Sequence, residues 1–100
     1  MAVGLEAAST GLCAAIAALP DPTEVERTFT NEAHAALHSL AAAAGLDRAD
    51  AARVLEGMEQ VETDFNSGDA GALATDLVAL QVSADEALRA LAIEVPVCAQ

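Results

Sequence analysis

His34 and His38 are the residues of this 100-residue sequence whose types and spacing are best suited to chemistry. Two imidazoles four residues apart on a helix project from the same face, so they are able to share a metal ion or flank the edge of a haem. No HExxH or ExxH motif accompanies them, and a metal site normally has three or four ligands. We therefore expect both histidines at the boundary between core and solvent, with metal, haem or small-ligand binding as the alternative.

Cys13 and Cys98 are the other candidate pair, and they lie near opposite ends of the chain. In an exported protein, a disulfide between them closes a loop over most of the chain, which the chain-entropy model values at about 4–5 kcal/mol. In a reducing cytosol, Cys13 is instead a small core side chain. Because a free thiol at Cys98 has no packing role in a tail, we expect the disulfide.

No other segment predicts a catalytic or cofactor site. The sequence contains no nucleophile elbow, phosphate loop or zinc knuckle. The segment 64–69, DFNSGD, departs from a calcium loop because its glycine falls one place early and Thr75 stands where the closing glutamate belongs. We interpret it as a turn that ends a helix. The sequence thus predicts a protein that is not an enzyme and has no cofactor.

The charge of the chain is strongly one-sided. Sixteen acidic residues face four arginines and no lysine, which gives a formal net charge of −12. Binding to phosphate backbones or anionic membranes needs a basic face, so nucleic acid and membrane surfaces are excluded as partners. An electrostatic partner would be a cationic protein, and the alternative is that the acids form only a solvated surface.

The apolar pattern predicts four helices, over residues 2–19, 22–44, 47–65 and 69–94. In the last segment, apolar residues recur at alternating spacings of four and three, as in a helix that packs lengthwise against others. They are Leu73, Leu77, Leu80, Ala84, Ala87 and Leu91. A second capping signal begins at Ser83, but the unbroken pattern favours one continuous helix. The buried stripe expected of the third helix comprises Ala51, Val54, Leu55, Met58, Val61 and Phe65.

Capping residues predict where these helices begin and end. Asp21 followed by Pro22 and Glu24 is a strong start signal for the second helix, and Gly45 is placed to cap its end. Gly11 is expected to weaken the first helix by roughly 1 kcal/mol. Short connections between four helices predict an all-α, antiparallel up-down four-helix bundle that forms a single domain over residues 1–100.

The N-terminal apolar run, residues 11–19, is too short to cross a membrane. It does not match a signal peptide, because no basic residue precedes it and Glu6 stands in the region that should be positive. We expect a mature chain whose export signal was removed, located outside the cell or in its envelope. The alternative is a cytoplasmic protein.

The lysine-free, alanine-rich composition, the early Cys13, the stretch AAAAGLDRADAARVLEGM and the closing VPVCAQ are similar to those of small exported helical proteins of high-GC actinobacteria. This resemblance covers the whole chain and implies an exported protein with its terminal cysteines paired. The WXG family of secreted helical hairpins is less similar, since the WxG turn is absent. Together, these features predict a non-enzymatic helical bundle, monomeric or homodimeric, that acts by binding another protein.

Overall fold

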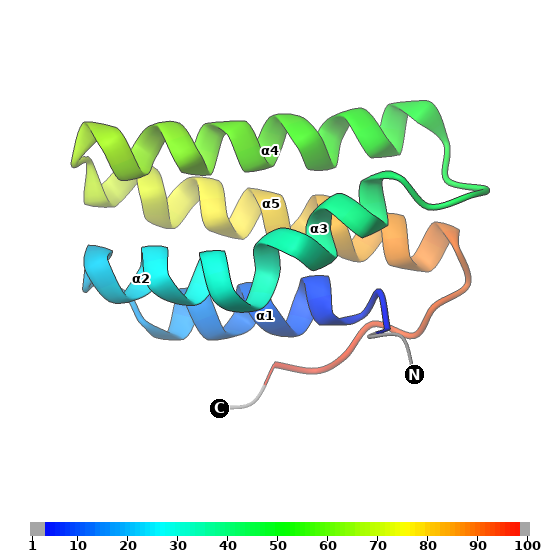
Figure 1. Cartoon of the computed structure of the whole chain (residues 1–100), viewed down its shortest axis with the longest axis horizontal. Coiled ribbons are helices and arrows are strands. Elements are labelled where there is room, and N and C mark those ends of the chain that lie inside the picture. The colour runs from blue at the N-terminus through cyan, green and yellow to red at the C-terminus, as the bar shows by residue number, and fades with distance from the viewer. Residues whose placement is uncertain (1–3, 99–100) are drawn as a thin grey trace.

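The computed structural model describes residues 4–98, and every regular element in that range is helical. The elements are α1 (Ala7–Ala17), α2 (Pro22–Thr28), the π-helical segment η1 (Phe29–Ala33), α3 (His34–Ala41), α4 (Arg48–Ser67) and α5 (Ala70–Ala90). Because α2, η1 and α3 follow one another without a break, they form one helical arm. The chain therefore has four arms, which run alternately up and down along the bundle (Figure 1). The predicted all-α four-helix bundle is confirmed. No helix within residues 4–98 combines the length and the apolar character needed to cross a bilayer.

Two aspartates act as helix caps, and Asp21 does so at the predicted start of the second helix. The Oδ1 atom of Asp21 accepts hydrogen bonds from the backbone N–H groups of Thr23 and Glu24, at 3.1 and 3.3 Å. Asp69 accepts one from the N–H of Ala72 at 3.0 Å, at the start of α5. Each carboxylate thereby satisfies N–H groups that have no partner inside their helix.

The predicted boundaries of the first, second and last helices are wrong by a few residues, and the third helix ends at Ser67 and not at residue 65. The first helix begins at Ala7 and ends at Ala17, although residues 1–3 of the predicted range lie outside the described part. The second arm ends at Ala41 and its C-cap is Ala42, so Gly45 does not cap it. Gly45 instead takes a positive φ of 89° in the loop, where the chain turns so that Leu46 packs against the core.

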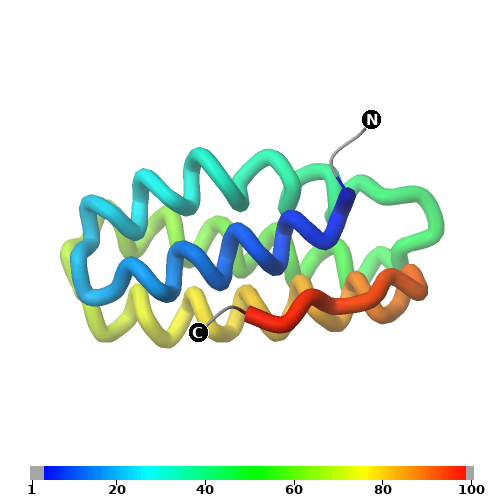
Figure 2. The backbone as a smooth tube through the Cα atoms, turned by 90° about the horizontal axis from the view of Figure 1, so that it is seen from below, coloured from blue at the N-terminus to red at the C-terminus, as the bar shows by residue number. Residues whose placement is uncertain are grey.

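The last helix runs unbroken past Ser83, as predicted, but ends at Ala90 and not at Glu94. Ala92 has a positive φ of 61°, and the N–H of Ile93 donates to the carbonyl of Leu88 at 2.9 Å. These are features of a Schellman motif, which ends a helix and reverses the chain. The reversal sends the tail back along α5 and α1 (Figure 2).

The core lies between the four arms and follows the predicted stripes closely. Of the six positions predicted for the last helix, five are at most 2% exposed, and Leu91, directly after the end of α5, is half-buried. The prediction that Leu55 belongs to the buried stripe is wrong, because its side chain is 44% exposed. It directly follows the buried Val54, and successive residues on a helix point about 100° apart, which turns Leu55 away from the core.

Two glycines permit close contact between helices. A Cβ on Gly11 would lie 2.3 Å from the backbone oxygen of Glu32, and one on Gly57 would lie 2.8 Å from a methyl group of Leu80. The expectation that Gly11 only weakens its helix is therefore incomplete. Gly11 also lets α1 approach the backbone of η1, the π-helical segment that directly precedes His34.

Candidate functional site

Two adjoining cavities lie where the second arm faces α4, and they share Glu26 and Phe65 as lining residues. Their volumes are about 250 and 260 Å³. The only two phenylalanines of the chain, Phe29 and Phe65, meet here edge to face with ring centroids 5.7 Å apart. We call the two cavities together the acidic groove. The side chains that define it are Glu26, Phe29, His34, Glu62, Asp64, Phe65 and Asp69.

The acidic groove is rich in carboxylates, and the basic side chain in its lining is that of His34. Four carboxylates line it, whereas none of the four arginines does. Arg27 is held by Glu24 at 2.5 Å on its own helix, and Arg53 is likewise held by Asp50. Two of the four cations are therefore already paired away from the groove.

His34 and His38 lie side by side on α3, with ring centroids 4.6 Å apart in an edge-to-face arrangement. The Nε2 atom of His34 is 3.3 Å from the Oε2 atom of Glu62, so the two form an ion pair whenever His34 is protonated. His34 is half-buried and His38 is exposed, which is the boundary position that the sequence predicts. Within residues 4–98, no group of three or more His, Cys, Asp or Glu side chains is arranged to hold a metal ion.

The π-helical segment η1 helps to position His34. The N–H of His34 donates to the carbonyl of Phe29, five residues earlier, which is the π-helical pattern. Phe29 is buried, and its ring centroid is 6.2 Å from that of His34. The segment η1 therefore anchors the second arm in the core through Phe29 and places the imidazole of His34 beside that ring.

Asp64 is the groove residue whose burial the sequence did not predict. It lies in α4, within the helix predicted over residues 47–65, and it is only 5% exposed. A side-chain hydrogen bond with Asp76, burial, and the nearby charges of Asp76 and Asp69 together raise the pKa of Asp64 to about 6. The sequence contains a signal for this burial, because Asp64 stands three residues after Val61 of the predicted stripe and so falls on the same helix face.

The predicted disulfide joins Cys13 to Cys98, whose Cα atoms are 5.6 Å apart at a sequence separation of 85. The side-chain amide of Gln81 donates toward both sulfurs, at 2.9 Å to Cys13 and 3.3 Å to Cys98. A crevice of about 300 Å³ beside the bond is lined mainly by small and apolar side chains. The disulfide therefore holds the tail against α1 and α5, where Figure 2 shows it.

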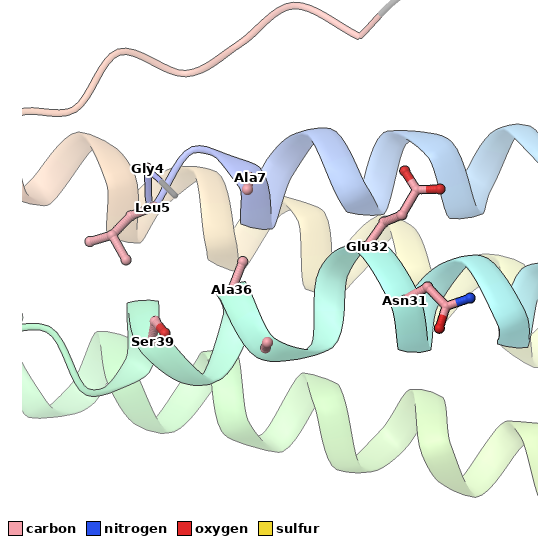
Figure 3. A pocket seen from close by; sticks show the side chains of 8 residues that line it. Gly4, Leu5, Ala7, Asn31, Glu32, Ala36 and Ser39 are labelled. Carbon is pink, nitrogen blue, oxygen red and sulfur yellow. The ribbon is translucent and has the colours of Figure 1, made fainter. Parts of the chain in front are cut away.

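A further cavity, of about 450 Å³, lies between the start of α1 and the segment formed by η1 and α3. Figure 3 shows Ala7 and Ala36 on its two sides, with Asn31 and Ser39 at opposite ends. Among the described residues that line it, Glu32 is the only ionisable one. The lining thus contains no nucleophile with a neighbouring base, and the cavity lacks the convergent polar groups that fix a small ligand.

Comparison of the chain with protein-family models, with curated proteins and with solved structures gives no match.

Proposed function

We propose that this protein is an exported, non-enzymatic binding module that holds a cationic segment of another protein in the acidic groove. The observation that carries the proposal is the composition of that groove. It combines two phenylalanine rings with four carboxylates and lacks any arginine of its own.

The chemistry of lysine and arginine side chains suits such a groove. Their methylene stems pack on apolar surface while the charged ends remain near water, and a cation above an aromatic face gains about 0.5–1 kcal/mol at an exposed site. Glu26 and Glu62 are placed to accept charge-assisted hydrogen bonds from those ends. The net charge of −12 would also steer a cationic partner toward the protein.

The disulfide supports the proposed location outside the cytoplasm, because such bonds persist in oxidising compartments. Thiol titration of the protein, unfolded without reductant and without prior alkylation, tests this part. We expect no free thiol from Cys13 or Cys98. Two free thiols would favour the cytoplasmic alternative.

Octalysine is a suitable probe of the groove, with octaglutamate as the peptide control. Titration of the ¹⁵N-labelled protein with octalysine, followed by amide chemical shifts, should perturb α2, η1 and the second half of α4. The Glu26→Gln/Glu62→Gln double variant should bind octalysine at least several-fold more weakly than the parent protein.

The Glu56→Gln/Glu59→Gln double variant is the matched control, because it removes the same number of charges from exposed positions of α4 that line neither cavity of the groove. It should retain nearly all of the affinity. An equal loss in both double variants would mean that octalysine responds only to net charge, and the proposed groove would then be wrong.

A second candidate function is metal, haem or small-ligand binding by His34 and His38. The close approach of their rings, with Glu62 near His34, favours it. Haem titration followed in the Soret region, and Zn²⁺ titration followed by histidine ¹H–¹⁵N shifts, test this candidate. No spectral change, or the same change in a His34→Ala/His38→Ala double variant, would eliminate it.

A further inference from the structure

Asp64 on α4 is within hydrogen-bonding reach of Asp76 on α5, near the turn that joins these helices. The helices are antiparallel (Figure 1), and Gly57 packs against Leu80. This register puts residue 64 opposite residue 73, one helical turn before Asp76. Asp64 is 5% exposed, and its Oδ2 atom is buried without a hydrogen-bond partner. Two ionised carboxylates cannot hydrogen-bond to each other, since neither has a donor.

The surroundings of this pair are uniformly acidic. Asp69, in the turn, adds a negative charge close to Asp64. Glu26 of α2 lines the same 250 Å³ cavity of the acidic groove as Asp64 does. From α5, the facing group is Asp76 itself. Neither an arginine nor a histidine lines this cavity, so no positive charge there stabilises a buried carboxylate.

We propose that Asp64 and Asp76 bind one shared proton, which fastens α4 to α5 near their turn in mildly acidic conditions and is released toward neutral pH. The protonated carboxyl group donates its O–H to an oxygen of the other. Loss of the proton leaves two like charges together, one of them buried, and this repulsion loosens that end of the bundle. The inference is independent of the proposed function and adds a pH-sensitive element beside the groove.

Two measurements test the shared proton. In the wild-type protein, the ¹³C carboxyl resonance of Asp64 should titrate well above the ordinary range for aspartate. The melting temperature should be higher at pH 5 than at pH 7 by roughly 5 °C or more. In Asp64→Asn, the amide donates permanently to Asp76, so the melting temperature at pH 7 should rise and most of the difference between the two pH values should disappear.

Glu56→Gln is the control, because it removes an exposed charge from the same helix. It should keep the wild-type difference in melting temperature, which accounts for the general effect of lowering net charge. The proposal is overturned if the Asp64 carboxyl titrates in its ordinary range, or if Asp64→Asn keeps the full difference. Should that variant not fold, the ¹³C titration of the wild-type protein decides alone.

Discussion

Gly11 of α1 and Glu32 of η1 pack backbone against backbone. A Cβ atom on Gly11 would lie 2.3 Å from the carbonyl oxygen of Glu32 and 2.6 Å from its carbonyl carbon, closer than real side chains approach such atoms. The atoms in the way belong to the main chain, so no side-chain rotation makes room. The contact between the first arm and the π-helical segment therefore requires a residue without a side chain.

Gly11→Ala should destabilise the protein by about 1–3 kcal/mol, even though alanine is the better helix former. The overlap with the backbone of η1 outweighs the propensity gain. Gly71→Ala is the matched control, since its Cβ would meet only the Asp69 carboxylate at an ordinary 3.5 Å. Urea unfolding should show opposite signs for the two variants, and a stabilising Gly11→Ala would refute the close contact.

Reduction of the disulfide should lower the free energy of unfolding by about 2–4 kcal/mol, because it frees a loop of 85 residues in the unfolded chain. Chemical unfolding with and without a phosphine reductant measures the loss. The Cys13→Ala/Cys98→Ala double variant should show the reduced stability in both conditions. A reductant effect in that variant would point to a cause other than this bond.

Ala92→Gly should stabilise the protein by roughly 1 kcal/mol. Ala92 holds a left-handed conformation that costs a residue with a Cβ about 1–2 kcal/mol and costs glycine little, and part of this gain is offset by the entropy that glycine loses on folding. Ala90→Gly, in the last turn of α5, is the comparison and should instead destabilise by about 1 kcal/mol. A destabilising Ala92→Gly would show that residue 92 does not hold the left-handed conformation of the Schellman motif.

Asp64→Asn should raise the free energy of unfolding at pH 7 by at most about 3 kcal/mol, given a folded pKa of about 6 against 3.8 for an ordinary aspartate. Well below pH 4, the Asp64 carboxyl group is protonated in both the folded and the unfolded chain, so it no longer lowers the free energy of unfolding. As the pH rises to about 6, the unfolded chain loses its proton first, so wild-type stability falls. Denaturant unfolding from pH 4 to 8 should show this fall in the wild type and a much flatter profile in the variant.

The helical arms could be predicted because their signals are local. The cap at Asp21 satisfies N–H groups two and three residues away, and the spacing from Leu73 to Ala87 depends only on helix geometry. The termini at Ala41 and Ala90 were missed because each is set by how the following loop or tail returns to the core. The pairing of Cys13 with Cys98 was predictable since only two cysteines exist.

The groove could be predicted only in part. The histidine pair was visible as an i, i+4 spacing, but Glu62 and Phe65 join it from another helix at a register that no local pattern encodes. The burial of Asp64 was missed because an aspartate near a helix end is ordinarily exposed, whereas the burial observed here depends on its place opposite α5.

The amino-acid sequence by itself determined that the protein is helical, strongly acidic and equipped with two cysteines able to join its ends, since these properties follow from composition and from interactions within a few residues. Only the tertiary structure decided that Gly11 is a contact point, that Asp64 meets Asp76, and that four carboxylates line a groove with two phenylalanines. The reason is physical: these relationships join residues on different arms, and their distances exist only once the arms have packed.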